Sequence, residues 1–259
     1  MWYNPDIGKK EVMSMGRKRG RGRRVGKRWV LCAASGCVLG IALISLFVFV
    51  ITLYPYLNLP KVTARDLDEL GLENYNKVMI VAHPDDELLW GGKHLLEDDY
   101  LVVCLTRGYD EVRRGEFERV LAETKDKGLI LSYPDKVGKK RSNWKFWRRD
   151  MEEDLTEILK YKDWELVATH NEEGEYGHKQ HIMTHESVKK VYQETGCKAK
   201  LFWFGKYYVD DKVPYDLMEM EKEVYNQKRK LAKIYESQRS SIRKLYHMLP
   251  YEYWEEENE

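Results

Sequence analysis

One histidine and three acidic residues follow a short apolar run in the segment Ala82-His83-Pro84-Asp85-Asp86-Glu87. Two further histidines, His178 and His181, lie much later in the chain and three positions apart. Imidazole nitrogens and carboxylate oxygens from distant segments are the ligands that a divalent metal such as zinc takes, with one position left open for water. The types and spacing of these residues therefore predict a metal-dependent hydrolase.

Strand-like and helix-like segments alternate around these residues. His83 and His170 follow two of the predicted strands, and the carboxyl ends of parallel strands form the edge where open sheets bind ligands. The alternation predicts an α/β, Rossmann-like three-layer body with a mostly parallel sheet. The hydrophobic pattern predicts strands at 77–82, 100–106, 129–131, 164–169 and 199–204, and helices at 84–96, 113–127, 150–161 and 178–194.

An apolar segment without charged residues, 29–57, follows a basic tail at residues 1–28. Roughly 20 apolar residues suffice to cross a bilayer, so the segment predicts one N-terminal transmembrane signal-anchor helix. The positive-inside rule places the tail in the cytoplasm and the catalytic body outside the cell membrane. A cleavable signal peptide is the alternative, and the sequence leaves open whether the anchor is ever cleaved.

The part of the chain after the anchor is predicted to contain a linker, one catalytic domain and a helical extension. Its acidic end, 252–259, is expected to be frayed, and His94 is expected to be solvated on its helix. Whether Cys104 and Cys197 pair is left open. The predicted boundaries are 58–74 for the linker, 75–210 for the catalytic α/β domain and 211–259 for the extension.

A basic loop at 136–149 contains Trp144 and Trp147 and is expected to rim the substrate cleft. As a hypothesis, its tryptophans touch a carbohydrate; a solvated basic loop is the alternative. Apart from the basic tail, the chain carries a net negative charge, which argues against nucleic acid as a partner.

The first segment, Ala82 to Glu87, resembles the leading motif of the PIG-L/LmbE-like deacetylases, and Gly177-His178-x-x-His181 looks like their second metal-site motif. Members of this family are zinc enzymes that remove acetyl groups from N-acetylglucosamine-type amides. By this resemblance, His83, Asp86 and His181 hold Zn²⁺, or another divalent metal.

The resemblance also implies catalytic roles. Asp85 would be the general base for the attacking water, and His178 would polarise or protonate the tetrahedral intermediate. Arg113 and Asp135 match substrate-contact positions more loosely. The loop 107–112 departs from the family's Gly-rich pattern, with a single glycine and several charges, so the sugar pocket it shapes is left undefined.

Together these features predict a membrane-anchored N-deacetylase whose substrate is an N-acetylglucosamine-type glycan or glycolipid. Two alternatives remain: an amide hydrolase acting on a non-sugar conjugate, and a non-catalytic carbohydrate-binding protein. The sequence does not define the oligomeric state.

Overall fold

The site is carried by a six-stranded sheet with the strand order β3-β2-β1-β6-β7-β8. The computed structural model describes residues 22–258, so residues 1–21 of the predicted basic tail lie outside the described residues. Neighbouring strands pair in parallel except β8, which runs antiparallel to β7. The strands are β1 (Lys77–Val81), β2 (Tyr100–Thr106), β3 (Lys127–Tyr133), β6 (Leu166–Thr169), β7 (Lys200–Phe204) and β8 (Trp254–Glu256), and a separate hairpin joins β4 (Lys136–Val137) to β5 (Lys140–Arg141).

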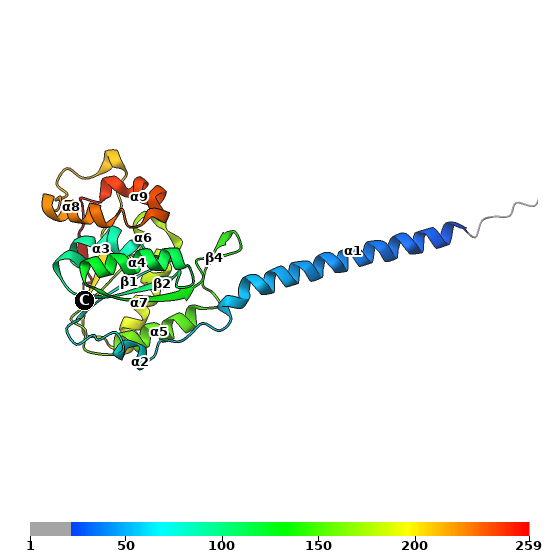
Figure 1. Cartoon of the computed structure of the whole chain (residues 1–259), viewed down its shortest axis with the longest axis horizontal. Helices are drawn as coiled ribbons and strands as arrows, with labels where there is room; N and C mark the ends of the chain where they lie inside the picture. Colours follow the sequence, from blue (N-terminus) through cyan, green and yellow to red (C-terminus); the bar gives the residue numbers. More distant parts are fainter. Residues whose placement is uncertain (1–21, 259) are drawn as a thin grey trace, which may run out of the picture. The chain divides into compact units, whose positions relative to one another are not determined.

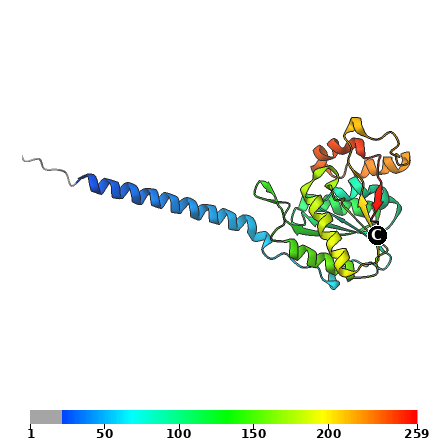
Figure 2. The ribbon, with the colours of Figure 1, turned by 180° about the vertical axis from the view of Figure 1, so that it is seen from behind.

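Helices cover both faces of the sheet, with α3 and α4 on one side and α5 and α7 on the other (Figures 1 and 2). Because successive side chains of a strand point to opposite faces, β1 contributes Val78 and Ile80 to one core and Met79 and Val81 to the other. The helices are α1 (Gly22–Leu53), α2 (Ala64–Asp68), α3 (Asp86–Glu97), α4 (Glu111–Thr124), α5 (Arg148–Lys160), α6 (Gly174–Gly177), α7 (Lys179–Thr195), α8 (Lys222–Leu231) and α9 (Arg239–Leu245), with 3₁₀ turns at Tyr54–Tyr56, Asp210–Lys212, Glu236–Gln238 and Tyr246–Met248.

The predicted α/β class with a mostly parallel sheet is confirmed, but one helix boundary was misplaced. The helix predicted to reach Lys127 ends at Thr124, because Lys125 adopts the left-handed conformation with φ 70°. Gly128 therefore lies inside β3 and does not cap the helix. A Cβ atom at Gly128 would lie 2.6 Å from Leu121 Cδ1, so the glycine lets α4 approach the sheet closely.

The acidic C-terminal end is ordered, contrary to the prediction that it frays. Trp254 begins the edge strand β8, and the carboxylate of Glu252 is buried 2.6 Å from Lys228 Nζ. Glu252 also accepts hydrogen bonds from the backbone N–H groups of Lys93 and His94. His94 is not solvated: its Nδ1 lies 2.7 Å from Glu252, and its ring stacks on Trp254 at 3.5 Å. The C-terminal extension is thus fastened to α3, the helix that begins at Asp86.

The N-terminal helix and the body form two separate units, divided between Ile51 and Thr52. Among the described residues, one helical segment, Cys37–Tyr56, is long and apolar enough to cross a membrane, with a mean hydropathy of 2.7. A signal sequence satisfies the same criterion. In the body, Cys104 is buried and Cys197 half-buried, and both thiols are free.

Candidate metal centre

The two sequence motifs meet at the carboxyl edge of the sheet. His83 follows β1, and Asp86 begins α3 after a turn in which Asp85 has φ 118°, a region that non-glycine residues rarely adopt. The backbone N–H of His83 donates to Asp86 Oδ2 at 2.8 Å and closes this turn. His178 occupies the residue before α7, and His181 lies in the first turn of that helix.

Three potential ligand atoms converge there. Asp86 Oδ2 lies 3.2 Å from His83 Nδ1 and 3.3 Å from His181 Nε2. The ring of His178 lies 4.2 Å from the ring of His181 and 5.0 Å from that of His83. Two overlapping residue groups could hold an ion: His83, His178 and His181, or Asp86, His170 and His181. Hydrogen bonds to the imidazole rings indicate which ring nitrogens of these two groups are free to bind an ion, and the set they favour draws on both groups.

Gln180 fixes the orientation of the His83 ring. The side-chain NH₂ of Gln180 donates to the backbone oxygen of Asp135 at 3.0 Å, which leaves Gln180 Oε1 facing His83 Nε2 at 2.9 Å. An amide oxygen only accepts, so His83 Nε2 carries the proton and Nδ1 offers its lone pair toward Asp86. This tautomer is inferred from the hydrogen-bond network.

Glu175 fixes the orientation of the His181 ring. Its Oε2 lies 2.5 Å from His181 Nδ1, so this nitrogen donates and Nε2 carries the lone pair. His181 Nε2 is buried and has no hydrogen-bond partner. Two electron-rich atoms, this nitrogen and Asp86 Oδ2, therefore face each other across 3.3 Å. A cation between them would satisfy both, and the carboxylate behind the histidine is the arrangement that orients metal-binding imidazoles.

His170 is placed to support the site without binding an ion. Its Nε2 accepts the backbone N–H of Ala82 at 3.0 Å, and its Nδ1 lies 3.0 Å from Glu175 Oε2. Both ring nitrogens are thus engaged. Burial lowers the pKa of His170, but Glu175 and Asp86 outweigh it and raise the pKa to about 9. A protonated Nε2 would oppose the Ala82 N–H, so the hydrogen-bond geometry favours the neutral ring.

The donor set fits a divalent metal. Two neutral imidazoles and one carboxylate, each held by a further hydrogen bond, match the nitrogen and oxygen ligation of catalytic zinc sites. Burial lowers the pKa of His83, but Asp135 and Asp86 raise it to about 9, and the same negative surroundings attract a cation. Burial opposes ionisation of Asp86, yet His181 and His170 hold its pKa well below the usual range.

Asp85 lies beside this ligand set with an environment suited to a base. Burial raises its pKa to about 7, although the Arg113 guanidinium acts in the opposite direction. Arg113 is itself buried and contacts both Asp85 Oδ1, at 3.2 Å, and the backbone oxygen of Pro84. The backbone N–H of Asp85 donates to Glu87 Oε2 at 3.1 Å, and Tyr235 donates to the other oxygen of Glu87. Arg113 therefore fixes the side chain of Asp85, and Glu87 fixes its backbone N–H.

His178 differs from the other histidines at the site because it has no carboxylate partner. Its Nδ1 is buried without a hydrogen-bond partner. Burial, together with the neighbouring His181 and His83, lowers the pKa of His178 to about 2, so its ring is neutral. The neutral His178 ring lines the cleft beside the ligand set, where it can meet a substrate.

A cavity of about 190 Å³ opens over these groups. Asp135 lies on its floor, with Oδ1 3.6 Å from His83 Nε2 and Oδ2 paired with Arg107. Arg141 Nη1 lies 3.4 Å from Asp135 Oδ1. Burial raises the pKa of Asp135, but His83 and Arg107 outweigh burial and lower the pKa below its usual value. The opposite wall comes from the C-terminal extension through three residues, Gln238, Ser241 and Leu245.

The hypothesis that tryptophans of the 136–149 loop touch the substrate is not supported for either ring. Trp144 is 1% exposed, and its indole N–H donates to the backbone oxygen of Pro134. Trp147 is 8% exposed, and its indole N–H donates to the backbone oxygen of Tyr56. The loop instead contributes polar side chains to the cleft, Lys136 and Arg141.

Sequence reasoning assigned no role to Glu175 or Gln180. Gln180 adjoins His181 and lies inside the second motif. The role of its amide cannot be predicted from the sequence, because that role depends on hydrogen-bond partners that only the fold defines. Glu175 lies in a segment with non-helical φ 57° at its own position, which the chain pattern does not reveal. Gln180 acts through a hydrogen bond to His83, 97 residues away, whereas Glu175 acts on His170 and His181, five and six residues away.

Comparisons with known proteins indicate the family of this chain and proteins of related fold. The family model described as PIG-L, GlcNAc-PI de-N-acetylase, matches residues 78–192. An uncharacterized protein, L374, from Acanthamoeba polyphaga mimivirus is 30% identical over 189 residues, which cover 66% of this chain and 75% of that protein. The crystal structure of a deacetylase from the biosynthesis pathway of teicoplanin superposes with a TM-score of 0.51 at 15% identity, covering 64% of this chain and 86% of the other. A 4-carboxy-2-hydroxymuconate hydratase, GalB, from Pseudomonas putida gives a TM-score of 0.48 at 14% identity, covering 67% and 84%.

The fold and the site thus define an α/β protein with a candidate metal centre at the carboxyl edge of its sheet. The chain belongs to the PIG-L family, whose members are described as GlcNAc-PI de-N-acetylases. The matched residues include His83, Asp85, Asp86, His178 and His181. The anchor segment and the C-terminal extension lie outside the match.

Proposed function

We propose that this chain is a metal-dependent N-deacetylase acting on an N-acetylglucosamine-type sugar. The observation that carries the proposal is the convergence of His83 Nδ1, Asp86 Oδ2 and the unpartnered His181 Nε2 beside a carboxylate, Asp85, whose pKa burial raises to about 7. Membership of the PIG-L family supports the same reaction class.

The proposed ligands are His83, Asp86 and His181, and zinc is the metal their donor atoms suit best. When bound, such an ion activates water and polarises an acyl oxygen. Asp85 accepts the proton of the attacking water, and a base with a pKa near the working pH does this most effectively. The resulting carboxylic acid returns the proton to the departing amine nitrogen.

His178 is proposed to act on the acyl oxygen. Its neutral ring donates a hydrogen bond to the charge that develops on that oxygen, which is a stabilisation that operates mainly in the transition state. Its lowered pKa, about 2, makes it a hydrogen-bond donor and not a proton donor. Arg113 acts through its contact with Asp85, and Asp135 is placed to meet sugar hydroxyls.

We further propose that residues 29–57 anchor the protein as a single-pass helix, with the tail in the cytoplasm and the catalytic domain outside. The apolar segment Cys37–Tyr56 and the basic residues before it support this orientation. The proposed catalytic domain, 75–210, then faces the cell surface together with the 211–259 extension, where N-acetylated glycans or glycolipids are available.

The test uses the full chain in phosphatidylcholine nanodiscs, loaded with one equivalent of zinc. Acetate release is measured from N-acetylglucosamine glycosides and from non-sugar N-acetyl amines. Asp85→Asn should retain zinc and lose roughly 10²–10⁴-fold in rate, because a positioned base contributes about that much. Asp99→Asn, which changes an exposed carboxylate that precedes β2 and does not line the cleft, is the matched control and should leave the rate unchanged.

Release from the sugars that disappears with a chelator and with Asp85→Asn would support the proposal. Release only from the non-sugar amines would favour a different amide hydrolase. Zinc-loaded, folded protein that releases no acetate from any of them would contradict the enzymatic proposal.

A further inference from the structure

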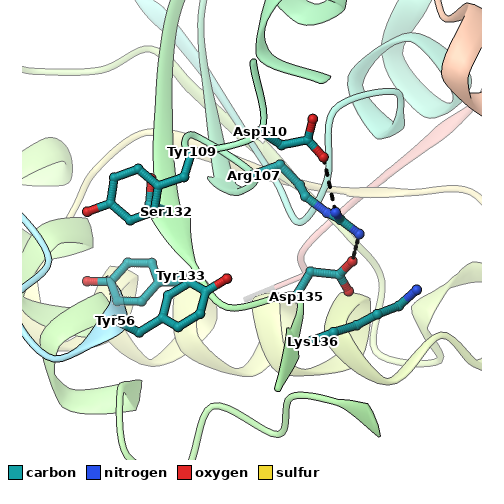
Figure 3. A pocket seen from close by; sticks show the side chains of 8 residues that line it. All are labelled: Tyr56, Arg107, Tyr109, Asp110, Ser132, Tyr133, Asp135 and Lys136. Carbon is teal, nitrogen blue, oxygen red and sulfur yellow. Dashed lines mark hydrogen bonds and ion pairs between the residues drawn. The ribbon is translucent and has the colours of Figure 1, made fainter. Parts of the chain in front are cut away.

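A second cavity, of about 330 Å³, lies beside the metal centre (Figure 3). Its volume is at the lower end of small-molecule sites, roughly 300–1,000 Å³. Tyrosine rings line one side and charged side chains the other, and Ser132 completes the lining (Figure 3). The lining residues are Tyr56, Arg107, Tyr109, Asp110, Ser132, Tyr133, Asp135 and Lys136.

This cavity adjoins the catalytic cleft. Arg107, Asp135 and Lys136 line both of them. Arg107 bridges Asp110 and Asp135 (Figure 3). The other oxygen of Asp135 lies 3.6 Å from His83 Nε2, so this one carboxylate contacts a proposed metal ligand and also lines the second cavity.

The chemistry of the lining matches a hydroxylated ring. Tyr56 and Tyr109 present two rings with centroids 6.5 Å apart and tilted by 44°. Sugar rings offer apolar C–H faces to aromatic rings and hydroxyl groups to charged or polar side chains. Asp110 and Asp135 hold the Arg107 guanidinium at the cavity. Lys136 has no ion-pair partner among residues 22–258, so its ammonium group is free to meet a hydroxyl group.

Tyr56 is held firmly at this position. The indole N–H of Trp147 donates to its backbone oxygen at 2.7 Å, and the two rings meet edge to face at 6.3 Å. Tyr56 is the last residue of the apolar segment Cys37–Tyr56 and lies outside the family match. The wall formed by Arg107, Tyr109 and Asp110 belongs to the loop that departs from the family's Gly-rich pattern. The cavity therefore combines a residue from outside the family match, Tyr56, with residues that lie inside it.

We infer that this cavity is a second subsite, in which Tyr56 and Tyr109 bind the sugar ring adjacent to the ring that is deacetylated. The inference rests on the proposed function and adds a substrate class: saccharides of at least two rings. It also gives the end of the anchor segment a role in specificity. Tyr56 is a specificity-determining residue that contacts substrate remote from the reacting bond.

The test compares one-ring and two-ring substrates with the full chain in phosphatidylcholine nanodiscs. Acetate release is measured from methyl N-acetylglucosaminide and from disaccharides that carry N-acetylglucosamine in 1→4 and 1→6 linkage. The readout is the ratio of kcat/KM for the best disaccharide to that for the single ring. The wild type should favour the disaccharide, and Tyr56→Ala should lower the ratio about tenfold, a change of about 1.4 kcal/mol.

Two variants control this result. Tyr54→Ala removes another tyrosine of the same 3₁₀ turn. Tyr54 is 71% exposed and does not line the second cavity, so the ratio should be unchanged. Tyr56→Phe keeps the ring and should retain the ratio. Tyr109→Ala should lower it as Tyr56→Ala does, and it leaves the Trp147 contact intact.

A wild type without preference for any disaccharide would overturn the inference, as would an unchanged ratio in both Tyr56→Ala and Tyr109→Ala. If no substrate releases acetate, the proposed function fails, and saturation-transfer NMR of the same sugars decides the subsite separately. Tighter binding of the disaccharide that is lost in Tyr56→Ala would still support it. Equal binding of one-ring and two-ring sugars would overturn it.

Discussion

Replacing Glu175 by glutamine should weaken zinc binding without removing any proposed ligand. One carboxylate accepts three hydrogen bonds: from His181 Nδ1 at 2.5 Å, from His170 Nδ1 at 3.0 Å and from the backbone N–H of Asn171 at 3.1 Å. An amide has one accepting oxygen, so its NH₂ group must face at least one of these donors. The side chain is fully buried, and water cannot replace the lost bond.

The size of the effect follows from this geometry. The variant replaces the charged acceptor behind His181 Nδ1 by at most a neutral, weaker one, and weakening of such a hydrogen bond behind a metal-binding histidine costs about 10–100-fold in affinity. That corresponds to about 1.4–2.8 kcal/mol. The assay is a competition titration with a chromophoric zinc chelator, using the full chain in nanodiscs at neutral pH.

Glu173→Gln provides the matched control, since Glu173 is exposed and pairs only with Lys206 at 3.0 Å among the contacts described. Its zinc affinity should equal that of the wild type. Glu175→Gln protein that folds normally and binds zinc as tightly as the wild type would refute the reasoning. An equal loss in Glu173→Gln would show that the effect is not specific to the histidines.

Two further predictions concern titration and stability. Arg113→Gln removes the cation that lowers the pKa of Asp85, so the acid limb of the kcat/KM profile should move to higher pH; an unmoved limb with a raised KM would instead identify Arg113 as a substrate contact. Glu252→Gln leaves the Lys228 ammonium buried without a counter-ion, which should cost about 3–5 kcal/mol of unfolding free energy in chemical denaturation. Burial opposes ionisation of Glu252, but Lys228 lowers its pKa to about 2. The native pair therefore contributes stability above the unfolded pKa of about 4.3, and this contribution is lost as pH falls toward 2, whereas the variant should lack that pH dependence. An unfolding free energy equal to that of the wild type at neutral pH, or one that falls between about pH 4.3 and 2 as the wild type's does, would contradict the assignment.

The convergence of the two motifs was predictable because of a general property of parallel sheets. Each proposed ligand segment follows a strand or begins the next helix, and parallel strands bring their carboxyl ends to one edge. The two motif segments could therefore be placed together from chain order, whereas the choice of His83, Asp86 and His181 as ligands came from the family resemblance. The roles of the supporting residues could not, because Gln180 and Glu175 act through geometry that only the folded chain defines.

The structure of the C-terminal extension could not be predicted from the sequence. A run of acidic residues at a chain end has the composition of a solvated segment, and nothing local marks Glu252 as buried. Its partners Lys228, Lys93 and His94 lie 24 to 159 residues away in sequence. The second cavity was equally hidden, because it combines Tyr56 from the anchor segment with side chains that follow β2 and β3.

The most direct test of the central claim is zinc K-edge X-ray absorption on the stoichiometric zinc complex of the full chain, with His83→Ala and His178→Ala beside the wild type. The assignment of His83, Asp86 and His181 predicts two imidazole ligands and no sulfur in the wild type. It also predicts one imidazole in His83→Ala and an unchanged first shell in His178→Ala. Loss of an imidazole ligand in His178→Ala but not in His83→Ala would contradict the ligand set and the role proposed for His178.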